Sequence, residues 1–124
     1  MEKKNMMYKL ILTEEQARVV SIACEFFARM KMGQFNELIW YTMDSQHGSD
    51  DYCDRSDKAR ELLYEARKYL YPELNGYGHS YGIGKFDDAD TAFDVYQVIR
   101  PFLGDERKPF SFHKLPECIK YEED

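Results

Sequence analysis

The sequence is poor in cysteine and in long apolar runs, and each shortage excludes a class of protein. Three cysteines in 124 residues are too few and too scattered for a disulfide framework, and their odd number would leave one thiol unpaired in an oxidising compartment. The longest uncharged apolar stretch, residues 19–24, is far shorter than the roughly 20 residues needed to cross a bilayer. Residues 1–9 contain no apolar stretch of the kind found in a secretory signal. We therefore expect a cytoplasmic protein with free thiols and no membrane partner.

Positive charge is also scarce. The chain has 17 Lys plus Arg against 23 Asp plus Glu, a net charge of −6, which argues against a nucleic acid held by phosphate neutralisation. With 44% hydrophobic residues, the chain is long enough for one domain with a core and too short for two. We expect a single domain over residues 1–124.

Local signals predict four helices. Thr13, followed three residues later by Gln16, has the pattern of a capping box, and Gly33 is a natural stop for the helix that starts there. Pro72 would end the third helix, and Asp87 or Asp88 is placed to cap the fourth. The expected helices cover residues 13–32, 34–43, 56–71 and 87–100. The third is expected to bury a stripe formed by Ala59, Leu62, Leu63, Ala66 and Leu70.

Alternation of apolar and polar residues at the two ends of the chain predicts strands. Residues Met7–Leu12 and Phe110–Leu115 both alternate in this way. Paired with each other, they would form a two-stranded antiparallel ribbon packed on the helices, which gives an α+β fold. Such a ribbon is marginal alone, and 15% aromatic content exceeds what so small a core readily hides. We therefore expect a homo-oligomer.

Two segments have the composition of irregular, exposed chain. Residues 44–57 contain five aspartates against one arginine and no apolar period, which predicts an exposed acidic loop. Residues 117–124 form an acidic tail that we expect to fray. His47, Asp50 and Cys53 lie in the acidic segment but have no recognised metal-ligand spacing. We therefore expect no metal and no cofactor.

The segment 75–86 holds four glycines and three aromatics in twelve residues, so it is not a regular helix. Residues 78–82 have the letters of a nucleophile elbow but lack the strand before it and the helix after it. Gly84-Lys85 ends in Phe86 where a phosphate-binding loop needs Ser or Thr. No pair of residues identifies itself as nucleophile and base, so we expect no enzyme.

A looser interpretation of the same segment is a ligand site. Lys85 and His79 would contact an anion such as a phosphate, with Ser80 and Tyr81 as hydrogen-bond donors. Arg29 or Trp40 would form a wall of the site. The competing interpretation is that the glycines only permit an irregular connection and the aromatics cap the core.

Three stretches resemble a known group of proteins. Residues 12–20 (LTEEQARVV), 27–37 (FARMKMGQFNE) and 78–86 (GHSYGIGKF) are similar to small proteins carried by phages and prophages of Gram-positive bacteria. The resemblance implies a phage accessory protein acting in the host bacterial cytoplasm, and it carries over no catalytic motif. Some phage proteins of this size are homo-oligomers that sequester nucleotide immune signals, such as cyclic dinucleotides or cyclic ADP-ribose isomers.

By that analogy, the expected function is anti-defence: sequestration of a small nucleotide-like anion without catalysis. The alternative is an acidic inhibitor or adaptor that binds a host protein through residues 44–57 and the acidic tail.

Overall fold

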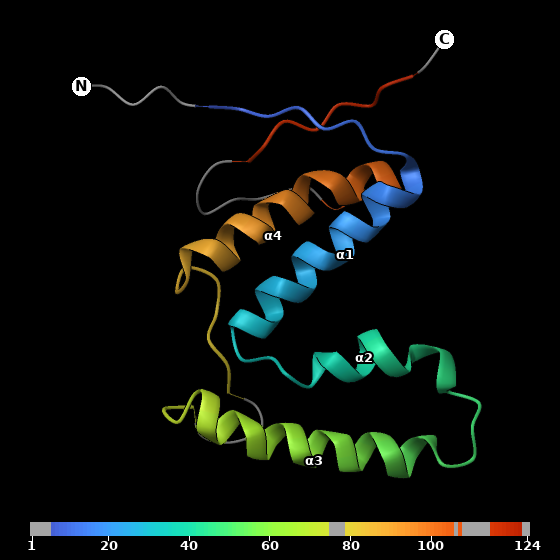
Figure 1. Ribbon diagram of the computed structural model, residues 1–124, viewed down its shortest axis with the longest axis vertical. Coiled ribbons are helices and arrows are strands. Elements are labelled where there is room, and N and C mark those ends of the chain that lie inside the picture. Colours follow the sequence, from blue (N-terminus) through green and yellow to red (C-terminus); the bar gives the residue numbers. More distant parts are fainter. Residues whose placement is uncertain (1–5, 75–78, 106, 108–114, 123–124) are drawn as a thin grey trace.

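The protein is an assembly of helices arranged in two pairs. The structure, a computed structural model, describes residues 6–74, 79–105, 107 and 115–122. Figure 1 shows α1 and α4 side by side at one end of the molecule, with α2 and α3 at the other. Residues 6–12 and 115–122, the described stretches nearest the two chain ends, lie beyond the α1–α4 pair. The elements, in order, are α1 (Glu14–Lys31), α2 (Glu37–Met43), the 3-10 helix η1 (Asp44–Gln46), α3 (Tyr52–Leu70), α4 (Asp87–Ile99) and the 3-10 helix η2 (Arg100–Leu103).

The N-terminus of α1 is held by the expected capping box. The backbone N–H of Gln16 donates to Oγ1 of Thr13 at 3.1 Å, and the Thr13 N–H donates to Oε1 of Gln16 at 2.9 Å. Each bond satisfies a backbone donor that the helix itself leaves without an acceptor. The prediction of this helix start from two residues is confirmed.

Thr13→Ala is expected to lower the free energy of unfolding by about 1 kcal/mol, because one N–H group loses its acceptor. Urea denaturation followed by circular dichroism measures the change. Thr42→Ala is the matched control, since Thr42 is an exposed helical threonine that bonds only the Leu38 carbonyl of its own helix. An equal loss in the two variants would contradict a specific role for the cap.

Small side chains bring α1 and α4 together. Ala28 of α1 is fully buried, and Ala89 of α4 is 2% exposed. With Met32 they form the centre of a core, against which Tyr81, Ile83, Phe86, Ala92 and Phe93 pack. Tyr81, Ile83 and Phe86, from the stretch just before α4, therefore cover one end of the helix pair.

The prediction of an α+β fold is wrong, because no strand occurs in the ranges that the structure describes. Residues Met7–Leu12 are extended but unpaired with any strand, and Met7, Tyr8 and Leu10 are 86%, 87% and 77% exposed. Residues 110–114 of the other expected strand lie outside the described residues. Alternation alone cannot supply the hydrogen-bond partner that a strand requires.

The acidic segment 44–57 is more regular than predicted. It begins with η1, and α3 starts at Tyr52, four residues earlier than expected. Acidic side chains near a helix N-terminus favour this extension, because they interact well with the helix dipole. Asp50, Asp51 and Asp54 are exposed, so the segment presents negative charge at the surface. None of the helices in the described part of the chain is long and apolar enough to cross a membrane.

Candidate functional site

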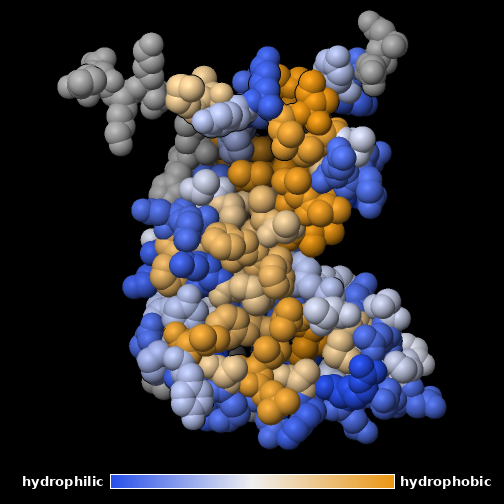
Figure 2. Space-filling view, viewed as in Figure 1, coloured by the Kyte–Doolittle hydropathy of each residue, from blue (hydrophilic) through white to orange (hydrophobic). Residues whose placement is uncertain are grey.

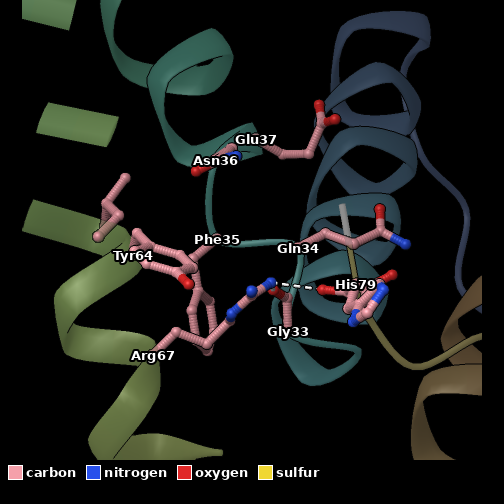
Figure 3. Close-up of a pocket in the computed structure, with 10 residues that line it drawn as sticks. Gly33, Gln34, Phe35, Asn36, Glu37, Tyr64, Arg67 and His79 are labelled. Atoms are coloured by element: carbon pink, nitrogen blue, oxygen red, sulfur yellow. Dashed lines mark hydrogen bonds between the residues drawn. The ribbon is translucent and has the colours of Figure 1, made fainter. Parts of the chain in front are cut away.

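A hollow of about 190 Å³ lies where the turn between α1 and α2 meets α3 and the segment that follows α3 (Figure 3). It is the candidate site because three separate stretches of chain contribute polar side chains to it. The lining residues are Gly33, Gln34, Phe35, Asn36, Glu37, Leu63, Tyr64, Arg67, His79 and Ser80.

Arg67 is the central charged group of this hollow. It lies one turn before the end of α3 and is only 6% exposed. Its Nη1 donates to the carbonyl oxygen of His79 at 2.5 Å and to that of Gly33 at 3.5 Å. The guanidinium carbon also lies 5.5 Å from the ring centroid of Tyr64, within cation–π range. Arg67 thus joins the three walls and places a positive charge beside the hollow.

Gly33 gives the first wall its shape. Its φ of +84° lies in the left-handed region, which glycine adopts at low cost. The Gly33 N–H donates to Met30 O at 3.0 Å and the Gln34 N–H donates to Arg29 O at 2.9 Å, which closes the end of α1. The chain then turns, so that residues 34–37 face α3.

Arg29 of α1 contacts Gln34 and Glu37, two residues of this wall. Its Nη1 donates to Oε1 of Gln34 at 2.8 Å and lies 3.8 Å from the Glu37 carboxylate. Its Nε lies 3.5 Å from Glu25. Figure 3 shows the Glu37 side chain directed away from Arg67. The one carboxylate in the lining is therefore turned away from the buried guanidinium.

Glu25 also accepts a hydrogen bond of 2.6 Å from the Tyr41 hydroxyl. The pKa of Tyr41 is raised mainly because the hydroxyl is partly buried, and the hydrogen bond to Glu25 raises it further. The Tyr41 ring packs edge-on against Phe26 with a centroid distance of 4.9 Å. These contacts fix α2 against α1 and so hold the turn that lines the hollow.

Tyr81 lies just past the hollow and anchors the segment that carries His79 and Ser80. Its N–H donates to Met32 O at 2.8 Å, and its hydroxyl donates to Glu73. That hydrogen bond is the main cause that raises the pKa of Tyr81 to about 12, and it lowers the pKa of Glu73. The Lys85 ammonium lies 5.2 Å from the Tyr81 ring centroid.

The structure thus brings together part of the predicted site. His79 and Ser80 line the hollow, and Arg29 supports its wall through Gln34. Tyr81 and Lys85 lie beyond the lining, and Trp40 is 57% exposed on α2. Residues 75–78 of the glycine-rich segment lie outside the described residues.

The sequence interpretation missed Arg67 and Tyr64. An arginine near a helix C-terminus has the pattern of a charge that compensates the helix dipole, so its position gave no reason to expect burial. The spacing of Tyr64 and Arg67 does place them on one face of α3. In the described ranges, no three His, Cys, Asp or Glu side chains gather in a group able to hold a metal ion.

Fold and site together define a small helical protein with a polar hollow beside a buried arginine. No family model, no curated protein and no solved structure matches the chain.

Proposed function

We propose that the protein binds a small nucleotide-derived anion in the hollow beside Arg67 and holds it without chemical change. The observation that carries the proposal is the buried guanidinium at the junction of three chain segments, with hydrogen-bonding side chains around it. A buried positive charge in a low-dielectric wall attracts an anion more strongly than an exposed one does. An arginine also presents planar donors suited to phosphate.

The rest of the lining suits the same ligand. His79, Ser80, Asn36 and Tyr64 carry groups able to donate hydrogen bonds, and the aromatic rings of Tyr64 and Phe35 offer flat apolar surface for a base or sugar. Glu37 is directed away from Arg67 and lies near Arg29, which reduces its repulsion of an anion.

The size of the hollow limits how the ligand sits. About 190 Å³ is less than the roughly 300 Å³ or more of most small-molecule sites. The hollow therefore suits one phosphate with its adjoining sugar, while the remainder of a cyclic dinucleotide or ADP-ribose derivative lies across the opening. The resemblance to phage proteins favours an immune signal as the ligand, sequestered by a phage or prophage accessory protein.

Isothermal titration with ADP-ribose, a cyclic dinucleotide and inorganic phosphate tests the proposal. We expect at least one nucleotide to bind more tightly than phosphate, and native mass spectrometry to recover it intact. Ser80→Ala is expected to weaken that nucleotide about tenfold, because one hydrogen bond to a charged group is lost.

Lys85→Ala is the control for a general effect of positive charge near the hollow. It removes a positive side chain near the site that lies on the Tyr81 ring and outside the lining, so the affinity should not change. If no ligand of the panel binds, or if Lys85→Ala weakens binding as much as Ser80→Ala does, the hollow is not the site.

A second candidate function is an inhibitor or adaptor that binds a basic surface of a host protein. The exposed acidic segment 44–57 favours it. Such a contact is expected to weaken markedly as salt rises, because exposed charges are screened. Binding to the hollow should depend less on salt.

A further inference from the structure

A second cavity, more open and more apolar than the hollow beside Arg67, lies between the C-terminal ends of α1 and α3. Its volume is about 350 Å³, and we call it the apolar cleft. Figure 2 shows apolar surface running from α1 toward the end of the molecule that holds α2 and α3. The cleft is lined by Phe27, Met30, Lys31, Phe35, Leu70 and Tyr71.

The apolar cleft adjoins the hollow beside Arg67. Phe35 lines both of them. On α3 the lining of the hollow ends at Arg67, and the cleft is lined by Leu70 and Tyr71, three and four residues further along. Residues at these spacings lie on the same side of a helix, and one helical turn rises only about 5.4 Å. A ligand that spans one turn of α3 therefore reaches from the hollow into the cleft.

We propose that the apolar cleft receives the base of a nucleotide whose phosphate lies beside Arg67. The inference rests on the proposed function and adds the part of the ligand that gives the site its specificity. The hollow alone, at about 190 Å³, is smaller than most small-molecule sites, whereas hollow and cleft together fall within the usual range of roughly 300–1,000 Å³. The pair therefore has room for phosphate, sugar and base.

The aromatic rings of the cleft suit a planar base. The rings of Phe35 and Tyr71 have centroids 6.0 Å apart and planes within 8° of parallel, so a base laid on either ring extends the same stack. The Tyr71 hydroxyl donates to the Lys31 carbonyl at 2.7 Å, which fixes one of these rings against α1. Phe27 adds a third aromatic ring to the lining.

The polar groups of the cleft indicate that the identity of the base matters little. Of the six lining side chains, only those of Lys31 and Tyr71 carry strong hydrogen-bond donors. The Tyr71 hydroxyl bonds the Lys31 carbonyl, and the Lys31 ammonium lies 3.5 Å from the Asp88 carboxylate. Stacking on aromatic side chains is tolerant, because every base has a π-face. Adenine and guanine nucleotides are therefore expected to bind with similar affinity.

Isothermal titration with AMP, GMP and ribose 5-phosphate tests the proposal. Ribose 5-phosphate carries the phosphate and sugar of AMP without the base. We expect AMP to bind about tenfold more tightly than ribose 5-phosphate, the usual gain from stacking one base on an aromatic side chain, and GMP to bind within about threefold of AMP.

Phe27→Ala separates the cleft from the hollow. Phe27 is 46% exposed, so the fold should tolerate its loss. The substitution should weaken AMP about tenfold and leave ribose 5-phosphate unchanged, which would also show that the hollow beside Arg67 stays intact. Trp40→Ala is the matched control, since Trp40 is an aromatic residue that is 57% exposed and belongs to neither lining. It should change neither affinity.

Equal affinity for AMP and ribose 5-phosphate would overturn the base site while leaving the anion site beside Arg67 in place. The base site is equally overturned if GMP binds no better than ribose 5-phosphate, if Phe27→Ala leaves the AMP affinity unchanged, or if Trp40→Ala lowers it as much. If neither the nucleotides nor ribose 5-phosphate bind, the proposed function fails and the base site fails with it.

Discussion

Arg67→Ala is expected to lower the free energy of unfolding by about 3 kcal/mol, because two backbone carbonyls lose a charged hydrogen-bond donor. The arginine is buried and bonds Gly33 O and His79 O. Its removal also leaves a space between α3 and the chain on either side of it. Urea denaturation followed by circular dichroism measures the loss.

Arg60→Ala on the same helix is the control. Arg60 makes an exposed ion pair of 3.2 Å with Asp57, and its side chain is 46% exposed. Such pairs contribute little, so its loss should stay within about 0.5 kcal/mol. Equal destabilisation by the two substitutions would mean that Arg67 does not hold the three walls together.

Gly33→Ala is expected to cost about 2 kcal/mol of stability. A side chain at φ +84° is strained by roughly 1–2 kcal/mol. The added Cβ would also lie 2.8 Å from Cδ1 of Leu74, so the Leu74 side chain must shift, and 3.4 Å from Cδ2 of Tyr71, which is an ordinary contact. Thermal and urea unfolding measure the effect.

Substitutions at two other glycines separate the cost of the strained backbone from the cost of the steric contact. A Cβ at Gly84 meets no atom within 4 Å, but its φ is +101°, so Gly84→Ala should show the backbone cost alone. Gly48 has neither a positive φ nor a neighbour within 4 Å, so Gly48→Ala should be neutral or slightly stabilising. A Gly33 variant as stable as the Gly48 variant would contradict this account of the α1–α2 turn.

Those parts of the fold that depend on a few neighbouring residues could be predicted from the sequence. The capping box at Thr13 fixed the start of α1, and Gly33 marked its end. Helix α3 ends before Pro72, and α4 begins at Asp87. Each is a local rule of backbone geometry or hydrogen bonding, so distant parts of the chain do not change the outcome.

Burial on α3 was predicted wrongly because it depends on what lies opposite the helix. Leu62, Ala66 and Leu70 of the expected buried stripe are exposed, and the buried residues of α3 are Ser56 and Arg67. A helix with apolar residues on more than one side leaves its packing face undecided. The carbonyls of Gly33 and His79, distant in sequence, favour the side that carries Arg67.

The site was predicted in part for the same reason. The glycine-rich and aromatic composition of residues 75–86 led to the prediction of a ligand site there, and two of these residues, His79 and Ser80, line the hollow. The opposite walls come from residues 33–37 and from α3, and no local pattern links those stretches. Their juxtaposition follows from the Arg67 hydrogen bonds, which exist only in the assembled fold.

The hydrogen bond between Tyr81 N and Met32 O has a consequence for how the molecule is divided. It joins the two points where the chain leaves the α1–α4 pair and returns to it, so residues 33–80 form an insert with a narrow neck. Every residue that lines the hollow belongs to this insert. The hollow is therefore built within one continuous stretch of chain, which contacts from Arg29, Tyr41 and Tyr71 hold against α1, so its walls keep their mutual arrangement for as long as that stretch stays folded.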